Sequence, residues 1–64
     1  MTSKELIKIL EQKGFLLKRI NGSHHIFQHP TSKKITVVPL HKKDLPKGTL
    51  SAILKQSGID KNGL

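Results

Sequence analysis

Three short strands are predicted by the segment FLLKRINGSHHIFQHPTSKKITVVP, residues 15–39. It holds three stretches rich in Phe, Ile and Val, each bounded by turn residues: Phe15–Ile20, His24–His29 and Lys34–Pro39. Asn21-Gly22 is a dipeptide favoured in tight hairpin turns, because both residues tolerate a positive φ. A slightly longer polar turn, Pro30–Lys33, precedes the third stretch. Connections this short predict an antiparallel three-stranded sheet.

A helix is predicted before the strands, over residues 3–13. Thr2-Ser3-Lys4-Glu5 is a capping box, in which Thr2 is the N-cap and Glu5 reaches back to it. Apolar residues then recur at helical spacing, and Gly14 can adopt the positive φ that ends a helix.

A second helix is predicted after the strands, over residues 46–57. Pro46 suits the first helical position, and Gly58 is the natural stop. Leu40–Leu45 is expected to be an irregular basic loop, and residues 60–64 a frayed tail.

The element order α-β-β-β-α predicts a two-layer α+β fold, with both helices on one face of the antiparallel sheet and the other face open. We expect a single domain over residues 1–64, because so short a chain has no material for a second core. Double-stranded-RNA-binding domains share this order, and they read the shape of A-form RNA.

The charge balance points to a polyanionic partner. Twelve Lys and Arg residues face four acidic residues, which gives a formal net charge of +8. Seven of the twelve lie between Lys18 and Lys47, where Asp44 is the only acid. The chain has no cysteine, no signal-peptide pattern and no apolar run long enough to span a membrane, so we expect a cytoplasmic protein without a membrane partner.

The run Gly22-Ser23-His24-His25 combines features that RNA cleavage needs. RNA breaks when its 2′-hydroxyl loses a proton and attacks the adjacent phosphate, and histidine can exchange that proton near neutral pH. Gly22 lets the backbone approach a phosphate, and the Ser23 hydroxyl can bond a phosphate oxygen. Neighbours on a strand point to opposite faces, so only one of the two histidines can be central to a site.

Further phosphate contacts are expected from basic residues of the strands and loops. His41 lies in the basic loop, where it could serve as a second acid or base, and a phosphate could dock near the start of the second helix. His29 is expected to have a turn or surface role. No metal site and no cofactor is expected. A zinc site needs three or four convergent ligands, whereas this chain has no cysteine and its two neighbouring histidines point to opposite faces. The phosphate-binding candidates are Gly22, Ser23, Lys18, Arg19, Lys33, Lys34, His41, Lys42, Lys43 and Lys47.

Over nearly its whole length the chain resembles the HicA toxins of bacterial and archaeal toxin–antitoxin pairs. Several short sequence runs, all in register, carry this resemblance. They are Lys4–Ile7, Gly14-Phe15, Gly22–Phe27, His29-Pro30, Val38-Pro39 with His41, Leu45–Leu50, Ile53–Gln56 and Gly58-Ile59. The resemblance implies a double-stranded-RNA-binding-like fold, metal-independent cleavage of mRNA that blocks translation, and a HicB-type antitoxin that covers the active histidine.

The family's catalytic histidine usually follows Gly-Ser directly, which implies His24, whereas some relatives have it one place later, which implies His25. Two other functions stay open at this point. One is a non-catalytic double-stranded-RNA-binding module of the same fold, which would bind RNA without cutting it. The other is an interaction protein that uses its charge only to grip an acidic partner.

Overall fold

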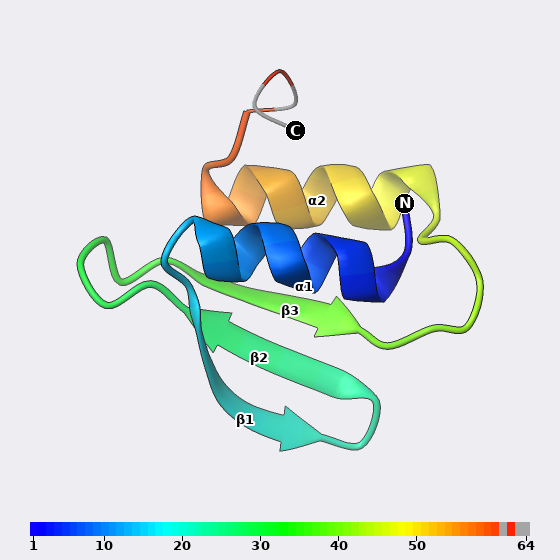
Figure 1. Cartoon of the computed structure of the whole chain (residues 1–64), viewed down its shortest axis with the longest axis horizontal. Helices are drawn as coiled ribbons and strands as arrows, with labels where there is room; N and C mark the ends of the chain where they lie inside the picture. The colour runs from blue at the N-terminus through cyan, green and yellow to red at the C-terminus, as the bar shows by residue number, and fades with distance from the viewer. Residues whose placement is uncertain (61, 63–64) are drawn as a thin grey trace.

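A computed structural model describes residues 1–60 and residue 62 of the chain. The predicted order of elements is confirmed (Figure 1): α1 (Ser3–Gln12), β1 (Leu16–Asn21), β2 (His24–Gln28), β3 (Ile35–Pro39) and α2 (Lys47–Ser57). The strands form one antiparallel sheet in the order β1-β2-β3. The expected tail, residues 60–64, lies largely outside the described residues.

Both helices begin and end close to where local sequence signals place them. The capping box of α1 is complete, because Glu5 N–H donates to Thr2 Oγ1 (3.2 Å) and Thr2 N–H donates to Glu5 Oε1 (2.9 Å). At the end of α2, Gly58 takes the left-handed conformation with φ 72°. Pro46 is the N-cap of α2 and not its first helical residue, a difference of one position from the prediction.

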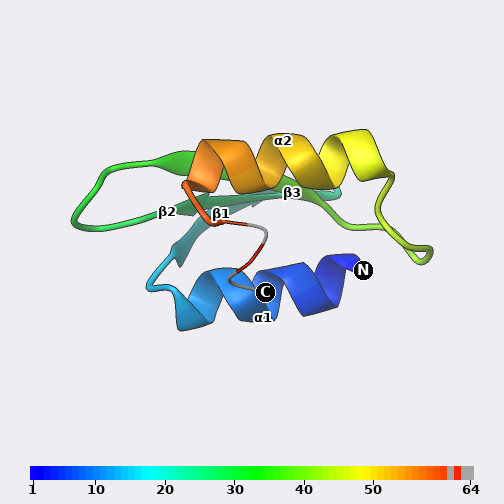
Figure 2. The same ribbon diagram turned by 90° about the horizontal axis from the view of Figure 1, so that it is seen from above.

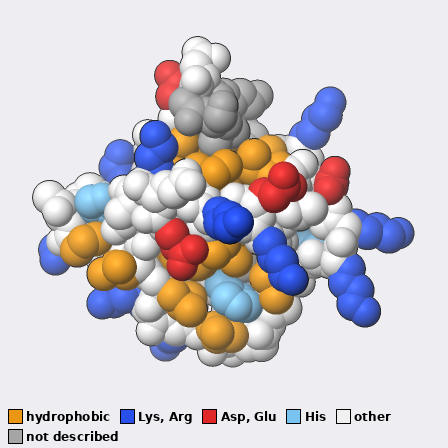
Figure 3. Space-filling view, viewed as in Figure 1, with side chains coloured by type: hydrophobic (Ala, Val, Ile, Leu, Met, Phe, Trp, Pro, Cys, Tyr) orange, Lys and Arg blue, Asp and Glu red, His pale blue; other side chains and the backbone are white. Residues whose placement is uncertain are grey.

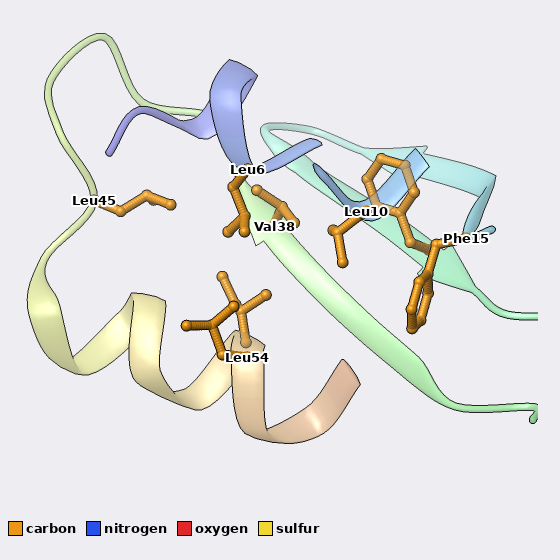
Figure 4. Close-up of a cluster of buried hydrophobic side chains, with 8 residues drawn as sticks. Leu6, Leu10, Phe15, Val38, Leu45 and Leu54 are labelled. Atoms are coloured by element: carbon orange, nitrogen blue, oxygen red, sulfur yellow. The ribbon is translucent and has the colours of Figure 1, made fainter. Parts of the chain in front are cut away.

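The core lies between the helices and one face of the sheet. Leu6 and Leu10 of α1 and Ile53 and Leu54 of α2 form a single buried cluster with strand side chains such as Val38. Figure 4 shows Leu6 and Leu10 of α1, Val38 of β3 and Leu54 of α2 pointing toward one another. Both helices therefore bury their apolar side chains against the same face of the sheet, the face that carries Phe27 and Val38. The complete cluster is Leu6, Leu10, Phe15, Phe27, Val38, Leu45, Ile53 and Leu54.

The helices cover the sheet unevenly. Figure 2 shows α1 lying over the sheet and α2 running alongside β3. Every residue of β1 is exposed, including Leu16 (54%), Leu17 (46%) and Ile20 (56%). Because the helices pack toward β3, the helix-facing side of β1 stays uncovered, and Leu17 and Ile20, which pair with Phe27 and His25, form an open apolar shelf there.

Candidate active site

The turn between β1 and β2 is a two-residue loop, Gly22-Ser23, because Asn21 pairs with His24 across it. Only Gly22 has a positive φ (62°), which is the pattern of hairpin turns with glycine at the first central position. The expectation that Asn21 and Gly22 form the turn is corrected by one position, since Asn21 ends the strand. Apart from Gly22 and its two chain neighbours, no described residue has an atom within 4 Å of where a Gly22 Cβ would stand, so the turn is open to an approaching ligand.

The two histidines point to opposite faces of β2, as the strand geometry predicts. Phe27 is 1% exposed and faces the helices, so His25, two residues before it, faces the same way. The cross-strand neighbours of His25 are Ile20 and Val38. His24 lies on the open face of the sheet, between Asn21 and Pro39, and is exposed.

The carbonyl oxygen of Ser23 lies next to the ring of His25 and to the backbone of the loop that follows β3. It lies 3.4 Å from His25 Nδ1 and accepts a 2.8 Å hydrogen bond from Leu40 N–H. When Nδ1 carries the proton and donates to that oxygen, Nε2 keeps a lone pair and can accept a proton. His25 is half-buried beside the apolar shelf of β1, and Figure 3 shows histidine surface among hydrophobic side chains on this face.

Ser3 anchors the basic loop that follows β3. Its buried Oγ donates to Pro39 O (2.8 Å) and accepts from His41 N–H (3.1 Å), which joins the start of α1 to the end of β3. Leu40 is bonded to Ser23, so the loop that carries His41 begins beside the histidine turn. The sequence signal at Ser3 indicated only a helix start, and this second role depends on residues 36 and 38 positions away.

The basic candidates lie in several parts of the molecule. His41, Lys42 and Lys43 follow the end of β3 that pairs with His24. Arg19 lies opposite Ile26 on the face that carries His24. Lys18 occupies the irregularity between Leu17 and Arg19, and Lys47 is the first residue of α2.

Lys33 and Lys34 lie in the turn that joins β2 to β3, at the other end of the sheet. Lys33 takes a positive φ of 64° there. The length of β2 separates both lysines from His24 and His25. A track of basic residues from the histidine turn would therefore have to run along the whole strand to include them.

Among residues 1–60 and 62, no three His, Asp or Glu side chains gather where they could hold a metal ion. None of the helices in that part of the chain is long and apolar enough to cross a membrane.

The fold and this site define a small, strongly basic α-β-β-β-α protein with an accessible histidine beside an open turn and a basic loop. The family model described as HicA toxin of bacterial toxin-antitoxin matches residues 3–59 of the 64. The chain belongs to the HicA toxin family. It is therefore a toxin of a toxin–antitoxin system, and the family implies a cognate antitoxin as its partner. No curated protein matches the chain.

Proposed function

We propose that this toxin is a metal-independent endoribonuclease that cuts mRNA in the cytoplasm and so blocks translation. The observation that carries the proposal is the arrangement at His25. One ring nitrogen faces the Ser23 carbonyl, the other is left to exchange a proton, and a basic loop begins beside the same turn. That arrangement, in a chain of net charge +8 from a toxin family, suits cleavage of a polyanion.

The reaction needs only a base, an acid and positive charge. His25 Nε2 takes the proton of the 2′-hydroxyl, the 2′-oxygen bonds the phosphorus, and the bond to the 5′-oxygen breaks. The leaving 5′-oxygen takes a proton from an acid, for which His41 in the adjacent loop is the candidate. The products are a 2′,3′-cyclic phosphate and a 5′-hydroxyl, so no water or redox partner is consumed in this step.

The charge that grows on the phosphate needs donors nearby. Gly22 exposes its backbone at the open turn, and Ser23 adds a hydroxyl. Lys42 and Lys43 are exposed in the loop that starts beside Ser23. These groups are the proposed phosphate clamp.

The geometry favours His25 over His24 as the base. The family resemblance placed His24 first, with His25 as the alternative. His25 is half-buried with one nitrogen oriented by a carbonyl, whereas the ring of His24 has no hydrogen bond within the described residues and is exposed. An oriented base holds its lone pair toward the substrate without losing side-chain freedom at the moment of reaction.

The test replaces each histidine alone. His25→Ala lowers kcat by about 10²–10⁴-fold on a single-stranded RNA in the presence of EDTA, and His24→Ala retains most of the activity. We expect both variants still to bind the RNA when binding is measured by fluorescence anisotropy. The reverse result assigns the base to His24. Full activity in both variants rules out a base at the histidine turn, and a wild-type protein that binds RNA without cutting it is a binding module instead.

We also propose that the antitoxin is of the HicB type and inhibits by covering His25. The shelf beside this histidine is apolar, with Leu17 and Ile20 exposed, and the adjoining loop is basic. A partner with apolar side chains would bury the shelf, and acidic side chains on the same partner would neutralise the basic loop. A complex in which His25 stays accessible to solvent, measured by histidine NMR titration, would contradict this arrangement.

A further inference from the structure

A hollow of about 350 Å³ lies at the end of the molecule opposite the histidine turn. Three segments meet there: the end of α1, the turn between β2 and β3, and the residues that follow α2. Figure 1 shows these three on one side of the molecule and the β1–β2 turn on the other. The lining includes Lys13, Phe15, Ser32, Lys34, Ile59 and Asp60.

His29 builds one wall of this hollow and holds it in shape. Its Nε2 lies 3.1 Å from Lys13 O, and its Nδ1 accepts from the backbone N–H of Thr31 (3.1 Å) and Ser32 (3.3 Å). Since Nδ1 is an acceptor, Nε2 carries the proton and donates to Lys13. The ring also meets Phe15 edge to face, with centroids 5.2 Å apart. The walls that come from the end of α1 and from the β2–β3 turn are thus joined by hydrogen bonds before any ligand enters.

The lining has the chemistry of a nucleotide site. Buried Phe15 lies at the floor of the hollow, and half-buried Ile59 gives part of its wall an apolar surface that a base can contact. Lys13 and Lys34 bring two ammonium groups, and a methyl group at Gly58 would collide with the Lys34 ammonium, which places that charge at the end of α2. Asp60 adds one acceptor for a base amino group or a ribose hydroxyl.

We propose that this hollow binds a nucleotide of the RNA strand whose backbone is cut at the histidine turn, a few nucleotides away from the cut. The inference rests on the proposed function. His29 and His25 are four residues apart on the same side of β2, which separates them by about 14 Å. A single strand of RNA spans that length in a few nucleotides, and Leu17 and Ile20 lie exposed on the β1 side between the two ends.

The experiment compares two paired variants of equal charge. Lys13→Ala/Lys34→Ala removes the two ammonium groups of the hollow, and Lys4→Ala/Lys8→Ala removes two exposed lysines of α1 outside it. Binding is measured by anisotropy with a labelled RNA dodecamer in a His24→Ala/His25→Ala background, so no cleavage is needed. The hollow variant weakens binding about tenfold and the control about twofold or less, because only the first loses direct phosphate contacts.

With the histidines restored, the loss in kcat/KM grows with RNA length, being large for the dodecamer and small for a dinucleotide that cannot reach the hollow. Equal losses in the two paired variants overturn the proposal, because they indicate diffuse attraction. Weaker binding of the antitoxin with unchanged RNA binding also overturns it, and assigns the hollow to the protein partner. If the wild-type protein does not cut RNA but the hollow variant still weakens RNA binding, the proposed function is overturned and the proposal for the hollow is supported.

Lys34 lies against the end of α2, so circular dichroism and thermal unfolding check the fold of each variant. NMR of the wild-type protein gives a measurement that needs no substitution at the hollow. Addition of the dodecamer shifts the backbone amides of Ser32 and Ile59 more than those of Lys4 and Lys8. Shifts confined to the histidine turn would contradict the proposal.

Discussion

His29 shows how a single side chain determines the shape of one end of this molecule. Its ring bonds the carbonyl that ends α1 and two amides of the β2–β3 turn. The sequence prediction of a turn role agrees with these contacts. We expect His29→Ala to lower the free energy of unfolding by about 2 kcal/mol, because three hydrogen bonds and an aromatic contact are lost at a half-buried site. Urea unfolding measures this, and an unchanged midpoint would mean that water replaces the ring without cost.

Two glycines with positive φ differ in what surrounds them. At Gly22, a Cβ would meet no described atom within 4 Å other than those of its chain neighbours, so Gly22→Ala carries only the backbone cost of φ 62°, about 1 kcal/mol. At Gly14, φ is 96° and a Cβ would stand 2.9 Å from His29 Nε2. We therefore expect Gly14→Ala to lower the thermal midpoint more than Gly22→Ala does. The opposite order in thermal unfolding would contradict the positions of these two turns.

The start of α1 makes stability depend on pH. Hydrogen bonds from Thr2, its backbone N–H first, hold the pKa of the Glu5 carboxyl below its ordinary value of 4.5. A group whose pKa is lower when folded adds stability above its unfolded pKa, and this is lost as pH falls through the folded pKa. We expect Glu5→Gln to remove the part of the acid-induced loss of stability that comes from Glu5, and to leave the part that comes from other groups. Urea midpoints measured across the acid range for both proteins check this, and parallel curves would contradict it.

Ser3 joins two elements that are distant in sequence. Replacement by Ala removes the donor to Pro39 O and the acceptor for His41 N–H in a buried place, which we expect to cost about 1–3 kcal/mol. The basic loop should also lose its fixed start, so amide hydrogen exchange of His41 should speed up more than that of α2. Exchange that rises equally everywhere would indicate a general loss of stability instead.

The elements themselves were predictable because their signals are local. A capping box, a glycine after each helix and short polar turns act over a few residues, and the predicted bounds agree with the structure to within one or two positions. The covered face of β2 was not predictable, because His25 and His24 alternate equally well and only the distant packing of Phe27 against the helices decides between them. The same holds for Lys34, whose place far from His24 and His25 depends on how β2 and β3 pair.

At the scale of the whole molecule, the core is small and lies to one side. Among residues 1–60 and 62, eight buried hydrophobic side chains from both helices, the strands and the loops form it, and β1 contributes none. A chain of this size has a narrow stability margin, so an exposed apolar strand is retained at some cost. Membership of the family implies a cognate antitoxin, and we propose the shelf next to His25 as the surface on which it binds.

The net charge of +8 makes RNA binding by the whole molecule depend steeply on salt. Each phosphate neutralised on a single strand adds about −0.7 to the slope of log K against log salt, so four contacts give about −3. If the hollow and the histidine turn share one strand, Lys13→Ala/Lys34→Ala should reduce the magnitude of that slope by about 1, and Lys4→Ala/Lys8→Ala should leave it nearly unchanged. Anisotropy titrations of the dodecamer at several salt concentrations measure both. Equal slopes for the two variants would mean that the positive charge acts as a diffuse field, and that the RNA has no fixed path between the two ends of β2.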